Sequence, residues 1–215
     1  MTRSADGKSY DRAYFDRWYR SRRHRIETAA ALRRRVALAL ALTEHLLERP
    51  VRTVLDVGCG EGRWRRELRR LRPSVRYVGV DSSPYVVERF GARRDLRLGT
   101  FAGLTAVETG GPFDLVVCAD VLHYLSDRDL SAGLPTLVAR TAGLAWLETL
   151  CLEDEVEGDR SGLVLRPAAE YRRCFRRAGL VPAGSHGWIP AALADRPPAL
   201  ALPPAGRRQT SNVTP

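Results

Sequence analysis

The sequence predicts an α/β fold, a doubly wound and mostly parallel sheet of seven strands with a helical cap at the N-terminus. Two patterns in the chain carry this prediction. From Val51 onward, short apolar runs alternate with helical stretches, which is typical of parallel strands with helices on both faces of the sheet. Before that point, residues 25–48 contain neither Gly nor Pro and are rich in Ala and Leu, so we expect a long helix that Arg49 and Pro50 end.

The individual elements follow from the same patterns. We expect strands at residues 53–57, 77–80, 96–98, 115–119 and 144–149, and two closing strands at 180–182 and 199–202. Besides the long helix, we expect helices at residues 10–20, 64–71, 85–90, 127–140 and 168–178. Ser126, with Asp129 three residues later, forms a partial capping box before the helix at 127–140, whereas Pro135 argues against the continuity of that helix. Pro167 and Gly179 bracket the last helix.

The bulk composition fits one globular unit, since 215 residues with 44% apolar side chains are enough to bury a core. We divide the chain into a cap or lid at residues 1–50, a core at 51–205 and a tail at 206–215 that is too poor in apolar residues to order itself. The four cysteines form no CxxC pair, so we expect reduced thiols and no metal site. The longest apolar run, 36–42, falls short of the roughly 20 residues of a membrane span, so we expect a soluble cytoplasmic protein without a membrane partner.

The charge leaves two interpretations open. The formal net charge is +10, and among 35 basic residues Lys8 is the single lysine. A basic surface favours nucleic acid or acidic partners through long-range attraction. A bias to arginine together with much Ala, Leu and Pro is also what a GC-rich genome produces, so the charge alone does not decide the partner.

A glycine-rich turn, "VLDVGCGEGRW" at residues 54–64, follows the first expected strand. Glycines there let the backbone approach a ligand closely, but a dinucleotide-binding turn needs a third glycine where this chain has Arg63, and a P-loop needs Gly-Lys-Ser/Thr. Asp56 at the strand end repels pyrophosphate and accepts hydrogen bonds from a cationic amine. Asp81, which ends the next strand, can accept both hydroxyls of a ribose. The pattern favours an adenosine with an attached amino acid over phosphates.

Three consecutive motifs, "VLDVGCGEGRW", "YVGVDSSPYVVERF" and "FDLVVCADVLHYLSD", resemble those of the class I S-adenosylmethionine-dependent methyltransferases, a Rossmann-like family, in order and spacing over residues 51–150. The resemblance implies S-adenosyl-L-methionine (SAM) as cofactor and S-adenosyl-L-homocysteine (SAH) as product. It implies cofactor contacts at Asp56, Gly58, Cys59, Gly60 and Gly62 for the methionine end, Asp81 and Ser82 for the ribose, and Ala119, Asp120 and Val121 below the sulfonium. The family usually has an acid after the third strand that reaches the adenine amine. This chain has Gly99, Thr100 and Phe101 there, so we expect stacking or backbone contacts to adenine.

Methyl transfer from a sulfonium is an in-line displacement that depends mainly on proximity and on the exclusion of water. A general base is needed only when the nucleophile arrives protonated. His123 and Glu148 are our candidates for that base, with packing beside the cofactor as the alternative role for His123 and catalysis by proximity alone if neither acts. Tyr14, Trp18, Tyr19 and Tyr124 are candidates for a lid and substrate contacts, with simple packing of the N-terminal helix as the alternative.

The acceptor is the least determined part of the prediction. We expect a small molecule, such as a biosynthetic intermediate, or a short peptide, methylated at O, N or C by a monomer or homodimer. The acidic run at residues 153–159 can attract a cationic acceptor or be a solvated loop. Nucleic acid is the alternative, because arginines cluster at positions 20, 22, 23, 25, 33, 34 and 35. The chain lacks the D/N-P-P-Y/F signature of the enzymes that methylate the amino group of adenine. It also lacks the second lysine that ribose 2′-O methyltransferases of the heat-shock type use for catalysis, because Lys8 is its single lysine. A non-catalytic binding protein and an NAD-linked oxidoreductase remain further alternatives.

Overall fold

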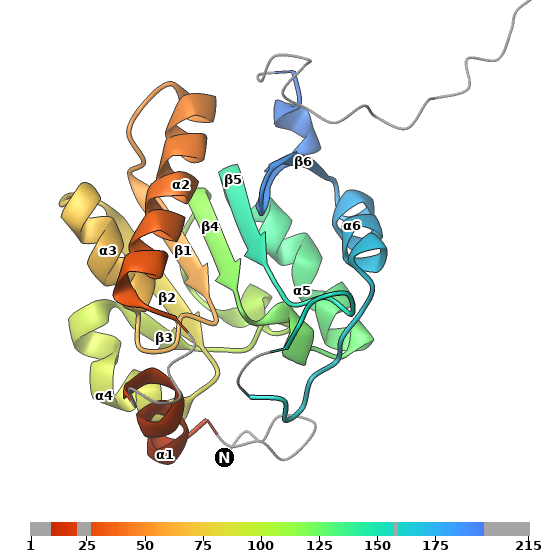
Figure 1. The fold of residues 1–215 in the computed structure, drawn as a ribbon. Helices are drawn as coiled ribbons and strands as arrows, with labels where there is room; N and C mark the ends of the chain where they lie inside the picture. Colours follow the sequence, from red (N-terminus) through yellow and green to blue (C-terminus); the bar gives the residue numbers. More distant parts are fainter. Residues whose placement is uncertain (1–9, 21–26, 157–158, 196–215) are drawn as a thin grey trace, which may run out of the picture.

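The computed structural model describes residues 10–20, 27–156 and 159–195, and its centre is one seven-stranded sheet in the order β3-β2-β1-β4-β5-β7-β6 (Figure 1). The strands are β1 (Thr53–Val57), β2 (Arg76–Asp81), β3 (Leu96–Leu98), β4 (Phe113–Ala119), β5 (Thr141–Glu148), β6 (Leu180–Gly184) and β7 (Gly187–Pro190). Strands β1 to β5 pair in parallel, whereas β7 is antiparallel to both β5 and β6. The predicted α/β class with a mostly parallel seven-stranded sheet is confirmed.

Each predicted helix has a helical counterpart in the described structure, with different ends. They are α1 (Arg12–Phe15), η1 (Asp16–Arg20), α2 (Ala29–Leu47), α3 (Arg63–Leu71), α4 (Pro84–Arg94), α5 (Asp127–Ala139) and α6 (Ala168–Arg177), with short turns η2 (Leu104–Ala106), η3 (Leu122–Tyr124) and η4 (Ala191–Leu193). The long helix begins at Ala29 because the Thr28 hydroxyl accepts a hydrogen bond from the Ala31 N–H at 3.1 Å. The predicted short helix is a helical turn, α1, followed by a π-helical turn, η1. Helix α5 runs through Pro135 without a break.

One predicted strand is not tested by the structure, and one strand of the structure was not predicted. The expected strand at 199–202 lies outside the described residues, and the last strand that the structure describes is β7 at Gly187–Pro190. A Gly at its start and a Pro at its end shorten the apolar run to two residues, which hides the strand from a periodicity analysis. The expected strand at 180–182 is present and extends to Gly184.

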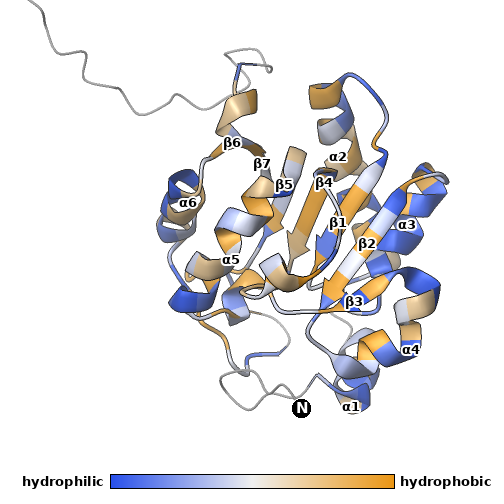
Figure 2. Ribbon diagram, turned by 180° about the vertical axis from the view of Figure 1, so that it is seen from behind, coloured by the Kyte–Doolittle hydropathy of each residue, from blue (hydrophilic) through white to orange (hydrophobic). Residues whose placement is uncertain are grey.

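The sheet is covered on both faces, as Figures 1 and 2 show from opposite sides. Helices α2, α3 and α4 pack on one face, against inward residues such as Val54 and Leu115. Helices α5 and α6 pack on the other face, against neighbours in the same strands such as Leu55 and Val116. Adjacent strand residues therefore pack against opposite layers, which explains why β1 and β4 are mostly apolar and buried.

The order of the strands fixes where a ligand can bind. The chain winds outward in opposite directions from β1 and β4, so a crevice opens at the carboxyl ends of these two strands. Figure 1 shows α1 at that end of the sheet. Within the described ranges, no helix has the length and apolar character that a membrane span requires.

Candidate active site

The glycine turn after β1 has a backbone that side chains do not tolerate. Gly58, Gly60 and Gly62 all have positive φ values, of 76°, 51° and 72°. A Cβ on Gly58 would lie 2.1 Å from Cγ2 of Val121, and one on Gly60 would lie 2.9 Å from the Tyr19 hydroxyl oxygen. Glycine is therefore required here both for conformation and for close approach of the turn to the segments after β4 and before α2.

Asp81, at the end of β2, ties that strand to the glycine turn. Its Oδ2 accepts the Gly60 N–H at 2.7 Å and its Oδ1 accepts the Ser83 N–H at 2.9 Å. Burial raises the pKa of the Asp81 carboxyl, while these two backbone hydrogen bonds lower it. Each carboxylate oxygen keeps a second lone pair, so the side chain can still accept hydroxyl donors from a ligand.

A cavity of about 370 Å³ opens where the glycine turn, Asp81 and the segments after β3 and β4 meet. This larger cavity is lined by Tyr10, Tyr14, Phe15, Tyr19, Val57, Gly58, Gly60, Asp81, Ser82, Gly99, Thr100, Phe101, Ala102, Asp120, Val121, Tyr124, Leu125, Ser126, Asp129 and Val164. Its volume is within the range of small-molecule sites. Among these described lining residues three are aspartates and none is Lys, Arg or His, so the wall carries negative charge.

A smaller cavity of about 80 Å³ adjoins the larger one and shares Tyr19, Gly58 and Asp120 with it. Its wall also includes Glu27 and Arg35 from the N-terminal part of the chain, Arg63 and Trp64 from α3, and Leu32, Asp56, Cys59 and Ala119. Unlike the larger cavity, this one presents charges of both signs. It is suited to a small zwitterionic group.

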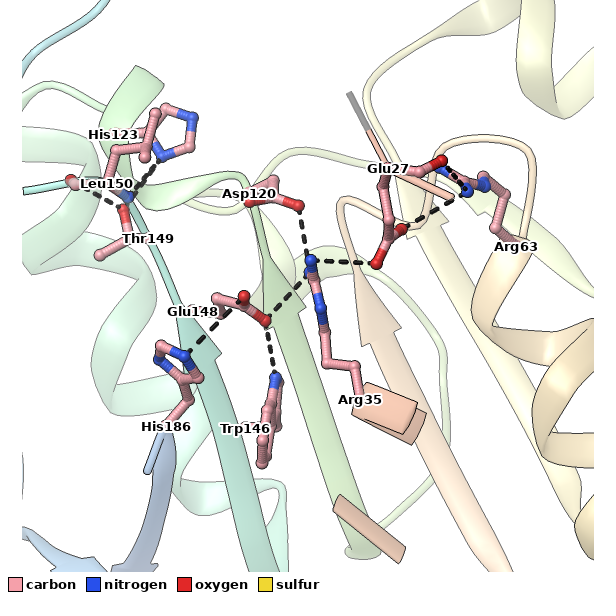
Figure 3. Close-up of polar contacts among 10 residues, drawn as sticks. All are labelled: Glu27, Arg35, Arg63, Asp120, His123, Trp146, Glu148, Thr149, Leu150 and His186. Carbon is pink, nitrogen blue, oxygen red and sulfur yellow. Dashed lines mark hydrogen bonds and ion pairs between the residues drawn. The ribbon is translucent and has the colours of Figure 1, made fainter. Parts of the chain in front are cut away.

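Arg35 is the centre of the charges around the smaller cavity (Figure 3). Its guanidinium lies 3.0 Å from Glu27, 3.0 Å from Glu148 and 3.3 Å from Asp120. Arg63 lies 3.4 Å from the other oxygen of Glu27. Burial raises the pKa of Glu27, whereas the nearby Arg35 and Arg63 oppose that shift. Arg35 contacts three carboxylates, whereas Arg63 contacts one of them, Glu27. Arg63 therefore has less negative charge beside it than Arg35 does.

Asp56 is buried beneath the glycine turn and lines the smaller cavity. Its Oδ2 accepts the Tyr77 hydroxyl at 2.7 Å. Burial raises the pKa of Asp56 to about 7, and the nearby Asp81 adds to the increase, while the hydrogen bond from Tyr77 opposes it. A cation that reaches the smaller cavity would therefore stabilise the ionised form of this carboxyl.

Glu148 lies outside the larger cavity. One of its oxygens contacts Arg35 and accepts the Trp146 indole N–H at 3.0 Å, and the other lies 3.8 Å from His186 (Figure 3). These contacts leave Glu148 as a partner of Arg35 at the end of β5. Glu148 lines neither of the two cavities.

His123 is 2% exposed and is also not among the residues that line either cavity. Its Nδ1 accepts the Leu150 N–H at 3.1 Å and lies 3.1 Å from the Thr149 hydroxyl oxygen (Figure 3). The His123 carbonyl oxygen accepts the Val164 N–H. These bonds fasten the segment after β5 to turn η3. His123 thus positions Val164, which lines the larger cavity.

The N-terminal segment 10–20 covers the glycine turn. Phe15 is buried, and the Ser83 hydroxyl donates to the Tyr10 carbonyl oxygen at 2.5 Å. Tyr10 and Tyr14 pack edge to face at 5.0 Å between ring centroids. Arg20 binds Glu61, which anchors the end of the segment beside the turn. Tyr14 and Tyr19, two of the aromatic side chains predicted for a lid, line the larger cavity, whereas Trp18 does not.

The sequence-predicted residues fall into three groups. Gly58, Gly60, Asp81, Ser82, Thr100, Phe101, Asp120, Val121, Tyr14, Tyr19 and Tyr124 line the larger cavity. Asp56, Cys59 and Ala119 line the smaller cavity. The remaining four line neither cavity: Gly62, Trp18, His123 and Glu148. Gly62 is the N-cap of α3, and the Trp18 ring packs under the Arg17 guanidinium.

Sequence analysis missed Glu27, Arg35 and Arg63 at the smaller cavity and Asp129 at the larger one. A signal existed for two of them, since Arg63 stands where a dinucleotide turn has glycine and Asp129 belongs to the capping box. No group of His, Cys, Asp and Glu suited to a metal ion occurs in the described part of the chain.

Comparison with known proteins agrees with this geometry. Residues 55–142 match a family model described as a methyltransferase domain. A trans-aconitate 2-methyltransferase from Deinococcus radiodurans is 33% identical over 106 residues, which cover 49% of this chain and 38% of that protein. The chain therefore spans well under half the length of this curated relative.

Two solved structures have a similar fold. The sugar N-methyltransferase KedS8 from Streptoalloteichus has a TM-score of 0.60 at 18% identity, covering 84% of this chain and 88% of its own. The amino pentose methyltransferase CalS10 from Micromonospora echinaspora, solved with SAM bound, has a TM-score of 0.58 at 17% identity, covering 84% and 96%. The domain match over residues 55–142, the motif order and the sheet topology support a class I SAM-dependent methyltransferase family for this chain.

Proposed function

We propose that this protein transfers the methyl group of SAM to a small-molecule acceptor. The observation that carries the proposal is the pair of joined cavities at the carboxyl ends of β1, β2 and β4. One cavity presents charges of both signs and the other presents an aspartate at the end of β2. Together they match a ligand with an amino acid at one end and a nucleoside at the other.

The residues present fit each part of SAM. In the smaller cavity Arg63 suits the α-carboxylate, and Asp56 suits the α-ammonium group. Asp81 suits the ribose hydroxyls. The excess of aspartates in the larger cavity favours a cationic sulfonium near Asp120 and Val121. SAM contains no phosphate, whereas NAD contains a pyrophosphate that a protein site must bind. This difference separates the proposed SAM site from an NAD site.

SAM, when bound, supplies a methyl group that leaves its sulfur as an acceptor lone pair forms the new bond. The chain's own contribution is to orient the two reactants and to exclude water, which the aromatic segment 10–20 accomplishes by covering the turn. Because His123 and Glu148 are fixed by other partners, we assign neither as a base. Catalysis by proximity follows, with an acceptor that arrives deprotonated or loses its proton to water.

The acceptor, on this proposal, is neutral or cationic. An anionic acceptor, such as the one in the name of the Deinococcus relative, would find no cationic side chain among the described residues of the larger cavity. Part of the arginine charge on α3 is also paired, since the buried Glu67 contacts Arg66 and Arg70. These pairs favour a small molecule over nucleic acid.

Isothermal titration calorimetry with SAH and with NAD tests the proposal. We expect SAH to bind with a stoichiometry of about one and NAD to give no heat. Transfer of labelled methyl from SAM to a panel of amines, alcohols and carboxylates then identifies the acceptor class. Binding of NAD without binding of SAH would refute the proposed function. Transfer of labelled methyl to carboxylates alone would refute the proposal that the acceptor is neutral or cationic.

A further inference from the structure

One side of helix α5 faces the segment that follows β3. A Cβ on Gly133 would lie 2.2 Å from Cδ1 of Phe101, and the Thr136 hydroxyl lies 2.7 Å from that of Thr105. At the end of the helix, the Arg140 guanidinium donates to the carbonyl oxygens of Leu104 and Val107. Positions 129, 133, 136 and 140 share one helix face because they are spaced by three or four residues.

Asp129 is the first residue on that face, so it lies beside the start of the same segment. Both Asp129 and residues Thr100, Phe101 and Ala102 line the larger cavity, as this placement requires. Ser126 fixes the Asp129 side chain, because its hydroxyl donates to Oδ2 at 2.8 Å and accepts the Asp129 N–H at 3.1 Å. Within the described part of the chain no hydrogen bond reaches the other oxygen, Oδ1.

The proposed cofactor has one order in which its parts can lie. The amino acid end occupies the smaller cavity, which joins the larger one at Tyr19, Gly58 and Asp120. The sugar binds Asp81, and the Gly99 N–H donates to the Asp81 carbonyl oxygen at 3.0 Å. The base, attached to the far side of the sugar, therefore extends along the segment that begins at Gly99 and reaches Asp129.

Adenine presents an exocyclic amine that needs an acceptor. The three residues after β3, Gly99, Thr100 and Phe101, include no carboxylate, and the Thr100 hydroxyl oxygen already accepts the Gly103 N–H at 3.0 Å. We propose that Asp129, from the first turn of α5, recognises the exocyclic amine of the cofactor's adenine. This assignment rests on the proposed function, and it makes Asp129 a residue that determines specificity for the base.

Calorimetry with two ligands tests the assignment independently of turnover. SAH carries the amine, and its 6-deamino analogue carries hydrogen at that position. We expect the wild-type protein to bind SAH at least about tenfold more tightly than the analogue, because a hydrogen bond to a charged acceptor is lost. In Asp129→Ala the two affinities should become equal, and in Asp129→Asn, whose amide oxygen still accepts, the ratio should be intermediate.

Glu88→Gln is the control, because it removes one negative charge from an exposed helix position that lines neither cavity. Its affinity ratio should equal that of the wild-type protein. Equal affinities of the wild-type protein for the two ligands would overturn the assignment without any variant, as would an unchanged ratio in Asp129→Ala. A wild-type protein that binds neither ligand would instead refute the proposed function.

Discussion

The two cavities differ in how the chain builds them. Gly58, Gly60 and Asp81 of the larger cavity come from turns that directly follow strands, so their place is fixed by the sheet. Glu27, Arg35 and Arg63 of the smaller cavity come from a loop and two helices, and they meet only because α2 and α3 pack side by side. A nucleoside site can thus be encoded in local motifs, whereas the amino acid site depends on tertiary packing.

The largest effect should come from the turn that both cavities share. In Gly58→Ala the added Cβ would overlap Val121, and we expect SAH affinity to fall by about 100-fold as the turn or the segment after β4 moves. The matched control is Gly179→Ala, since Gly179 also has a positive φ, of 90°, but a Cβ added there would have no atom within 4 Å. Calorimetry on both variants checks this. Unchanged affinity in Gly58→Ala would show that no ligand approaches the turn.

The next effect separates the two cavities. Arg63→Ala should weaken SAH binding by about tenfold and leave the binding of 5′-methylthioadenosine, which lacks the amino acid, unchanged. Arg63 is preferable to Arg35, whose removal would take a guanidinium partner from three carboxylates at once. Arg69→Ala on the same helix, with an exposed side chain, is the control. Equal losses for the two ligands in Arg63→Ala would contradict the division of the site.

This contrast also explains how far the sequence was informative. The first five strands and the glycine turn were predictable because alternating runs and positive-φ glycines are local signals. Asp129 was visible only as a helix-capping residue, and its place beside Phe101 depends on the contact at Gly133. The burial of His123 and the contact of Glu148 with Arg35 depend on residues distant in sequence, so the sequence alone could not show them.

A smaller effect is expected at His123, which tests whether it positions the chain or moves protons. His123→Ala should lower the free energy of unfolding by about 1–3 kcal/mol, because the Leu150 N–H loses its acceptor. The pH dependence of turnover should keep its shape. Urea unfolding and a pH–rate profile measure the two quantities, with the exposed His45→Ala as control. Loss of one limb of the profile at unchanged stability would instead make His123 the base.

The smallest expected effect is the release of a proton from Asp56 when SAH binds. Because burial raises the pKa of Asp56 to about 7, this carboxyl is mostly protonated at pH 6 and mostly ionised at pH 8. A bound ammonium group favours ionisation, so SAH binding at pH 6 should release up to about one proton and SAH affinity should rise with pH until about 7. Calorimetry in buffers of different ionisation enthalpy counts the protons. Asp56→Asn should release fewer protons than the wild-type protein, and equal release by the variant would exclude Asp56 as the source.

A crystal structure of the complex with SAH tests most directly whether a single ligand spans both cavities. We expect the homocysteine group beside Arg63 and Asp56, the ribose hydroxyls on Asp81 and the adenine amine on Asp129. A reversed ligand, or one whose amino acid end points away from the smaller cavity into solvent, would contradict this expectation.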